Sequence, residues 1–293
     1  MVGAPERWQA ELVLDAKAVL GEGPLWDELG SVLYWVDIDR AAVHRFDPAS
    51  GENLTCDAGE PVGAVALRSR GGLVLARRSG FAVLDDWGSP PRPFAAVESE
   101  RGETRMNDGA CDSRGRFWAG TMHAGLEPGH GSLYRLDPDA TVTRMLTGVS
   151  ISNGIAWSPD DGTMYYVDTP TGGVDAFAFE SERGTLGERR RVVDVDPVHG
   201  SPDGLVVDEA GCLWVGLWEG WAVHRYAPDG ELLGIVDVPV ARVTKCAFGG
   251  PDLDDLYVTT AAPEAADPAQ PSAGGIFRAR TGLRGLPARR FGG

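Results

Sequence analysis

The sequence predicts an all-β protein in which residues 1–293 form a single six-bladed β-propeller domain. Three observations lead to this fold class. A short phrase occurs six times, its copies lie at intervals that suit propeller blades, and an N-terminal segment is left over that can close the ring.

The repeated phrase consists of an apolar residue, a short turn of Asp, Gly, Ser or Pro, and an apolar strand rich in aromatic residues. Its first residues are Trp26, Leu67, Cys111, Trp157, Val207 and Phe248. The intervals are 41, 44, 46, 50 and 41 residues, and periods of roughly 40–50 residues with several short strands are typical of blades. Each interval has room for further strands, such as 173–179 and 189–194. No segment shows the apolar spacing of three and four that a helical repeat requires.

Closure of the ring can also be predicted. The 45 residues after Phe248 contain one more strand, at 275–280. Residues 11–20 precede the first copy of the phrase, and we expect them to complete the last blade as its outer strand. This N-terminal strand would join the two chain ends and cover an exposed sheet edge.

Composition excludes several classes of partner. The formal net charge of −16 and the absence of a basic stretch argue against nucleic acid, which would be repelled. No apolar run is long enough to span a bilayer, and residues 1–14 do not resemble a signal peptide, so we expect a cytoplasmic protein without a membrane partner. Four cysteines are scattered without CxxC spacing, which favours free buried thiols: Cys56, Cys111, Cys212 and Cys246.

The same register predicts a site in the central channel. The positions four residues before each phrase should lie on the innermost strands at one height: Glu22, Gly63, Asn107, Asn153, Asp203 and Thr244. Four of the six are carboxylates or amides. Two carboxylates this close repel each other unless a cation lies between them, and such oxygen ligands suit Ca²⁺, Mg²⁺ or Mn²⁺. The alternative is a wet channel in which these groups bind water.

Two further residues are candidates for contact with a ligand. Arg105 lies two residues before Asn107, so strand alternation points both side chains to one face. Its guanidinium could bind a substrate hydroxyl or carboxylate, or equally pair with a neighbouring acidic side chain. We expect His123 near the end of an inner strand, where it could touch a ligand, although a structural or surface histidine is the simpler interpretation. The sequence lacks GxSxG, P-loop and HExxH motifs, so the chemistries they support are not indicated.

Five phrases together resemble the gluconolactonase/regucalcin family of sugar-lactone hydrolases, over about residues 20–280. They are GEGPLW from Gly21, RMNDG from Arg105, GRFWAGTM from Gly115, SNG from Ser152 and SPDG from Ser201. The resemblance implies a six-bladed propeller with one divalent metal ion (Ca²⁺, Mg²⁺, Mn²⁺ or Zn²⁺) in its channel.

The resemblance also implies roles for individual residues. Glu22, Asn153 and Asp203 would be the metal ligands, Asp203 also the general base, and Arg105 and Asn107 the residues that hold the substrate. The family often has an acidic substrate contact shortly after a Thr-Met pair. Here no acidic residue follows Thr121-Met122 before Glu127, and we expect His123 to take over part of the pocket.

The resulting hypothesis is hydrolysis of a sugar lactone, an aldonolactone, to its aldonic acid, with the divalent cation as Lewis acid and Asp203 as general base. One alternative keeps this site but uses another cyclic electrophile or a phosphotriester. A second alternative is a non-catalytic propeller that binds calcium or a protein partner. The expected partner is a small sugar lactone, and no oligomeric state is predicted.

Overall fold

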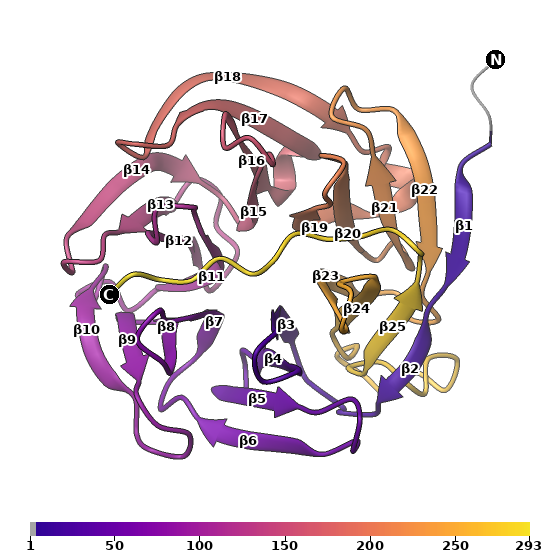
Figure 1. Ribbon diagram of the computed structural model, residues 1–293, viewed down its shortest axis with the longest axis horizontal. Coiled ribbons are helices and arrows are strands. Elements are labelled where there is room, and N and C mark those ends of the chain that lie inside the picture. The colour runs from indigo at the N-terminus through magenta and orange to yellow at the C-terminus, as the bar shows by residue number, and fades with distance from the viewer. Residues whose placement is uncertain (1–3) are drawn as a thin grey trace.

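The computed structural model describes residues 4–293, in which 25 strands form six sheets. The sheets are arranged as blades around a central axis (Figure 1), so the predicted six-bladed propeller is confirmed. Two single-turn 3₁₀ helices, η1 (Thr169–Thr171) and η2 (Pro197–His199), interrupt the strands. No helix in residues 4–293 has the length and hydropathy of a membrane span.

Every blade has the same strand order from the axis outward. The inner strands are β3 (Gly21–Asp27), β7 (Val62–Leu67), β11 (Thr104–Cys111), β15 (Ser152–Trp157), β19 (Ser201–Val207) and β23 (Val243–Gly249). The second strands are β4 (Val32–Asp37), β8 (Leu73–Arg77), β12 (Phe117–His123), β16 (Thr163–Asp168), β20 (Leu213–Trp218) and β24 (Asp255–Thr260). The third strands are β5 (Ala42–Phe46), β9 (Gly80–Leu84), β13 (Gly131–Leu136), β17 (Gly173–Glu180), β21 (Ala222–Tyr226) and β25 (Ile276–Arg280). The outer strands are β6 (Asn53–Asp57), β10 (Arg92–Ala96), β14 (Val142–Val149), β18 (Thr185–Asp194), β22 (Leu232–Asp237) and β2 (Glu11–Leu14).

The six apolar residues that open the repeated phrase have one structural role. Each is the last or next-to-last residue of an inner strand, and each is buried. They pack between neighbouring blades because an inner strand presents its apolar side chains to the sheets on either side. The phrase therefore marks the point where a blade turns away from the axis, as the sequence predicted.

Two copies of the phrase show why its turn contains an aspartate. One carboxylate oxygen of Asp112 accepts a hydrogen bond from the Arg114 amide at 2.9 Å and closes the turn. Its other oxygen accepts from the Trp118 indole at 2.9 Å. Asp208 and Trp214 repeat the second contact at 3.0 Å in another blade. The buried indoles thus have the partners that their N–H groups require.

The N-terminal strand closes the ring, but it is shorter than predicted. β2 pairs antiparallel with β25 and is the outer strand of the last blade. It ends at Leu14 rather than Leu20, because Lys17 has a φ of 52°, which a strand cannot accommodate. A strand that the sequence did not predict, β1 (Glu6–Gln9), pairs parallel with β22 of the preceding blade. The N-terminal segment therefore joins two neighbouring blades (Figure 1).

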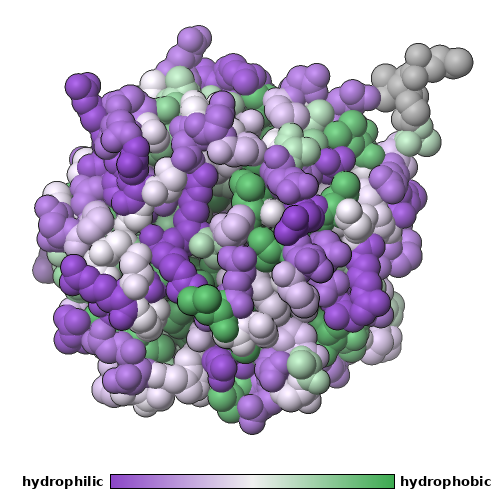
Figure 2. Space-filling view, in the orientation of Figure 1, coloured by the Kyte–Doolittle hydropathy of each residue, from purple (hydrophilic) through white to green (hydrophobic). Residues whose placement is uncertain are grey.

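The C-terminal segment after β25 crosses one face of the ring (Figure 1). It bridges to Asp208 through Gly285 and to Arg68 through Phe291. Phe291 is fully buried, and the Arg68 guanidinium donates to the carbonyl oxygen of Gly293 at 3.1 Å. Figure 2 shows polar and apolar side chains interspersed over this face. We call residues 283–293 the C-terminal strap.

Candidate active site

All six inner strands lose their regular pairing with the second strand at the same depth. The interruptions span Glu22–Leu25, Val62–Ala64, Met106–Gly109, Ser152–Ile155, Pro202–Leu205 and Val243–Lys245. The six positions that the sequence placed at one height all fall within these intervals or at their edges. Bulges of this kind disrupt the hydrogen-bond ladder and change the direction of side chains. More side chains can therefore face the channel at this depth than strict alternation allows.

Contacts between neighbouring inner strands confirm that these positions form a ring. The Thr244 hydroxyl donates to the Gly21 carbonyl oxygen at 2.6 Å. A Cβ atom on Gly63 would lie 1.9 Å from the Asn107 carbonyl oxygen, so only glycine allows this approach. We call the ring of residues 22, 63, 107, 153, 203 and 244 the site layer.

Glu22 and Asp203 are the two carboxylates of the site layer, and both are buried. Glu22 accepts a hydrogen bond from the Gly23 amide at 2.8 Å. Asp203 Oδ1 is buried without a hydrogen-bond partner among the described residues. Burial, followed by the charge of Asp108, raises the pKa of Glu22 to about 8. Burial and the charge of Glu22 raise the pKa of Asp203 well above its usual range.

The amides of the site layer form a connected network. Asn107 Nδ2 donates to Asn153 Oδ1 at 2.9 Å and to the Ser152 carbonyl oxygen at 2.8 Å. Asn153 Nδ2 donates to Thr169 Oγ1 at 2.8 Å, and this hydroxyl donates to the Pro202 carbonyl oxygen at 2.9 Å. Because the Thr169 proton is used by Pro202, the hydroxyl can only accept from Asn153. The Asn153 oxygen is thereby held toward Asn107, on the side away from Thr169.

Arg105 lies beside Asn107, as alternation along β11 predicted. Its Nη1 donates to Asn107 Oδ1 at 2.7 Å and to the Met106 carbonyl oxygen at 3.1 Å. Burial lowers the pKa of the guanidinium, while the charges of Asp39, Glu22 and Asp203 act in the opposite direction. The sequence left open whether Arg105 pairs with an acidic side chain. In these two hydrogen bonds its partners are the Asn107 side-chain oxygen and the Met106 carbonyl oxygen instead.

Comparison with known proteins identifies the family. Residues 20–262 match the SMP-30/gluconolactonase/LRE-like region. The chain belongs to this family. The pentonolactonase XacC of Haloferax volcanii is 40% identical over 286 residues, 94% of this chain and 95% of that protein. Regucalcin of Gallus gallus is 38% identical over 285 residues, 94% of this chain and 95% of that protein.

A solved structure of the same family gives a similar picture. The calcium-binding protein regucalcin from Agrobacterium tumefaciens superposes with a TM-score of 0.93 and 29% identity, covering 99% of both chains. The SMP-30/gluconolactonase family is a family of sugar-lactone hydrolases, so the resemblance seen in the sequence is confirmed.

The donor set of the site layer fits a divalent cation. Glu22, Asn153 and Asp203 offer only hard oxygen atoms, which Ca²⁺, Mg²⁺ and Mn²⁺ accept. The unpartnered Oδ1 of Asp203 is a buried acceptor that a cation would satisfy. The pKa values of Glu22 and Asp203 are both raised, so the two carboxyl groups tend to keep their protons unless a positive charge lies near them.

His123 ends β12, and Glu127 lies in the exposed loop that follows. His123 was expected near an inner-strand end, but it is the last residue of β12, a second strand, opposite Thr104 of the inner strand. Its Nδ1 accepts from the Gly125 amide at 3.1 Å. Its ring centroid is 5.3 Å from that of His130, which lies 3.6 Å from the Glu127 carboxylate. The hydrogen bonds described above leave His123 outside the amide network. Its contact with a substrate stays a prediction.

Sequence reasoning missed Asp108 and Lys245. Each directly follows a site-layer residue, Asn107 or Thr244, so strict alternation assigns its side chain to the opposite face. The interrupted pairing removes that constraint, and the two side chains meet as a buried ion pair. The available signal was Lys245, a charged residue inside β23, which is otherwise apolar apart from Thr244. Asp108 had no comparable signal, because β11 also contains Arg105 and Asn107.

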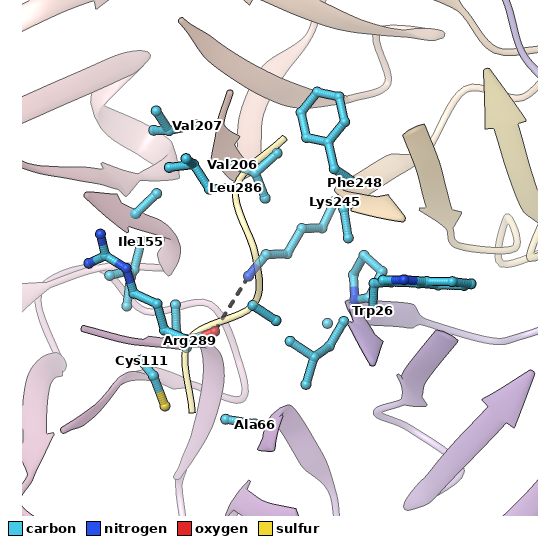
Figure 3. A pocket seen from close by; sticks show the side chains of 18 of the residues that line it. Trp26, Ala66, Cys111, Ile155, Val206, Val207, Lys245, Phe248, Leu286 and Arg289 are labelled. Carbon is cyan, nitrogen blue, oxygen red and sulfur yellow. Dashed lines mark hydrogen bonds between the residues drawn. The ribbon is translucent and has the colours of Figure 1, made fainter. Parts of the chain in front are cut away.

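The other end of the channel is a cavity of about 150 Å³. It is lined by residues that follow the site layer on the inner strands, including Trp26 and Phe248, and by Leu286 and Arg289 of the C-terminal strap (Figure 3). The strap therefore covers this end, and a substrate would approach the site layer from the opposite face, where the inner strands begin.

Proposed function

We propose that this protein hydrolyses a sugar lactone to its aldonic acid at one divalent cation held by Glu22, Asn153 and Asp203. The observation that carries the proposal is the buried, unpartnered Oδ1 of Asp203 beside a second buried carboxylate. Family membership supports the reaction class, since a pentonolactonase is 40% identical to this chain. The calcium-binding regucalcin structure supports the cation.

The geometry supports a separate role for the cation and for Asp203. A bound cation would supply a Lewis acid for the developing negative charge on the lactone carbonyl oxygen. Asp203 takes a proton from the attacking water, which requires its ionised form. In the metal-free protein, burial and Glu22 hold the pKa of Asp203 high, so its ionisation depends on a counter-charge. General base assistance is typically worth about 10²–10⁴-fold in rate.

Arg105 and Asn107 hold the sugar ring in this proposal. Their mutual hydrogen bond at 2.7 Å fixes the guanidinium, whose remaining N–H groups can donate to substrate hydroxyl or carbonyl oxygens. Asn107 is itself fixed by Asn153 and Ser152. A substrate bound to this pair is therefore positioned relative to the proposed cation ligands.

The test is proton release on adding D-glucono-, D-xylono- and L-arabinono-lactones to EDTA-treated protein, with Ca²⁺, Mg²⁺, Mn²⁺ or Zn²⁺ restored in turn. We expect hydrolysis that requires a divalent ion and that is lost in Asp203→Ala. Hydrolysis unaffected by EDTA, or retained in Asp203→Ala, would refute the mechanism.

A second candidate is calcium binding without catalysis, which the name of the Agrobacterium relative favours. Tight Ca²⁺ binding together with no hydrolysis of any lactone, with any of the four ions, would select it.

A further inference from the structure

Lys245 spans the central channel. It follows Thr244 on β23, the inner strand of the sixth blade, and only 5% of the residue is exposed. Its Nζ forms an ion pair with Asp108 of β11, the inner strand of the third blade. In a ring of six blades these two strands lie on opposite sides (Figure 1). Figure 3 shows the extended Lys245 side chain. Its ammonium also donates to the Gly109 carbonyl oxygen at 3.5 Å.

The protein makes room for this side chain. A Cβ atom on Gly204 would lie 2.4 Å from Lys245 Cγ and 2.8 Å from its Cδ. Gly204 follows Asp203, so the Lys245 stem passes directly beside a proposed cation ligand. A residue larger than glycine at 204 would displace the lysine from the channel.

Asp108 is a third buried carboxylate next to the site layer. It is 1% exposed, and its Oδ1 accepts from the Gly109 amide at 2.6 Å as well as from Lys245. Its Oδ2 is buried without a hydrogen-bond partner among the described residues. The charge of Asp108 also acts on both Glu22 and Asp203, so the three carboxylates form one electrostatic cluster.

Lys245 balances the charge of one of the three carboxylates, Asp108. The ammonium of Lys245 neutralises Asp108, and two carboxylates remain, Glu22 and Asp203. Two negative charges match one divalent ion. Without Lys245, the buried Asp108 carboxylate, whose Oδ2 already lacks a partner among the described residues, would have no counter-charge, and a second cation beside it would supply one.

We propose that Lys245 is a fixed internal cation that takes the place of a second metal ion beside Asp108, and so limits the channel to one divalent ion per chain. The inference rests on the proposed cation site but not on the identity of the substrate. It assigns Lys245 a positioning and charge-balancing role rather than a chemical step.

The experiment counts ions. Wild type, Lys245→Met, Lys245→Arg and the double variant Lys245→Met/Asp108→Asn are dialysed against Mn²⁺, and bound manganese is measured by mass spectrometry. Met keeps the length of the stem without its charge, Arg keeps the charge, and the double variant removes both charges. We expect one ion in wild type, Lys245→Arg and the double variant, and two in Lys245→Met.

One ion in folded Lys245→Met overturns the inference and leaves the proposed function intact. No ion in wild type overturns both, whereas absence of lactone hydrolysis with the expected ion counts overturns only the proposed function. If Lys245→Met does not fold, Asp108→Asn is compared with the double variant. An unneutralised ammonium in Asp108→Asn should weaken Mn²⁺ binding on the order of tenfold or more relative to the double variant. Equal dissociation constants overturn the inference.

Discussion

Asn153 donates its side-chain N–H to Thr169 Oγ1 at 2.8 Å, and this contact fixes which end of the amide faces Asn107 and the site layer. The Thr169 hydroxyl gives its own proton to the Pro202 carbonyl oxygen, so it cannot donate to Asn153. One threonine outside the site layer thereby orients a proposed cation ligand, and it links β15 to β19 in the next blade.

Thr169→Val should therefore weaken divalent ion binding. Valine removes the acceptor, so the Asn153 amide loses the contact that fixes its orientation. Loss of such supporting hydrogen bonds typically weakens metal affinity about 10–100-fold. Isothermal titration with Mn²⁺ measures the effect. Thr171→Val is the matched control, because Thr171 is an exposed residue of the same 3₁₀ helix. Unchanged affinity in Thr169→Val would contradict the network.

Asp203→Asn should abolish most turnover, with kcat reduced about 10²–10⁴-fold. The amide keeps an oxygen for a cation but cannot accept a proton from water. Steady-state lactone hydrolysis at saturating metal gives kcat and KM separately. Asp194→Asn is the control, since that side chain is 86% exposed on an outer strand. A kcat near that of wild type would exclude Asp203 as the base.

Arg105→Ala should act mainly on KM. Loss of hydrogen bonds from a charged donor corresponds to about 1.5–3 kcal/mol, or roughly 10–100-fold in binding. The proposed cation ligands remain, so kcat should change less than KM. Arg92→Ala, on an outer strand with its side chain 61% exposed, is the control for removing an arginine. A fall in kcat with KM unchanged would give Arg105 a different role.

The metal-free protein should become less stable as pH rises from 6.5 to 8. The folded-state pKa of Glu22 is about 8, above its unfolded value of 4.5, so the folded protein still holds a proton that the unfolded chain has released. One such proton lowers the free energy of unfolding by about 1–2 kcal/mol over this range. Below pH 6.5, His44 and His224 make the free energy of unfolding increase with pH. Burial lowers the pKa of each to about 4, so the unfolded chain binds protons there that the folded protein does not.

Urea denaturation in EDTA at the two pH values tests this expectation. Saturating Mn²⁺ should remove the decline, because a bound cation favours the ionised carboxylates in the folded state. Glu22→Gln should flatten the profile of the metal-free protein. A free energy of unfolding that stays constant or rises toward pH 8 in EDTA would contradict the raised pKa.

Phe291→Ala should destabilise the fold by about 3–5 kcal/mol, the usual range for truncating a buried aromatic side chain. Phe291 is fully buried and packs with the core around Phe81 and Phe117, although it belongs to the C-terminal strap. Leu29→Ala is the control, because Leu29 is 87% exposed. Equal midpoints of thermal unfolding for the two variants would show that the strap contributes little to stability.

The sequence predicted the fold because its signals are local. A turn aspartate, a buried aromatic residue and a glycine recur in nearly every blade, and each works through contacts within a few residues of itself. Asp112 with Trp118 is an example. β1 carries no such signal, since the ladder that it forms within residues 4–293 is with β22, more than 200 residues away.

The repeat register predicted one position of each inner strand in the site, but not its neighbour in the chain. Arg105 and Asn107 are two residues apart and do share a face. Asn107 and Asp108 both lie in the interrupted part of β11, and Lys245 lies at the edge of the interruption in β23. In such a segment both of two consecutive side chains can reach the channel, so a period of two identifies only one of them. Their pairing also depends on the opposition of the third and sixth blades, which follows from ring closure rather than from any local pattern.

The N-terminal strands have a consequence for synthesis. β1 and β2 leave the ribosome before the other strands of the ring, whereas their partners β22 and β25 are made more than 200 residues later. The early blades can form during translation, whereas the ring cannot close before the whole chain is available. Until then, the partner edges for β1 and β2 do not exist, and the apolar residues of these strands stay exposed. The slowest folding event should therefore be closure of the ring, when β1 and β2 pair with β22 and β25.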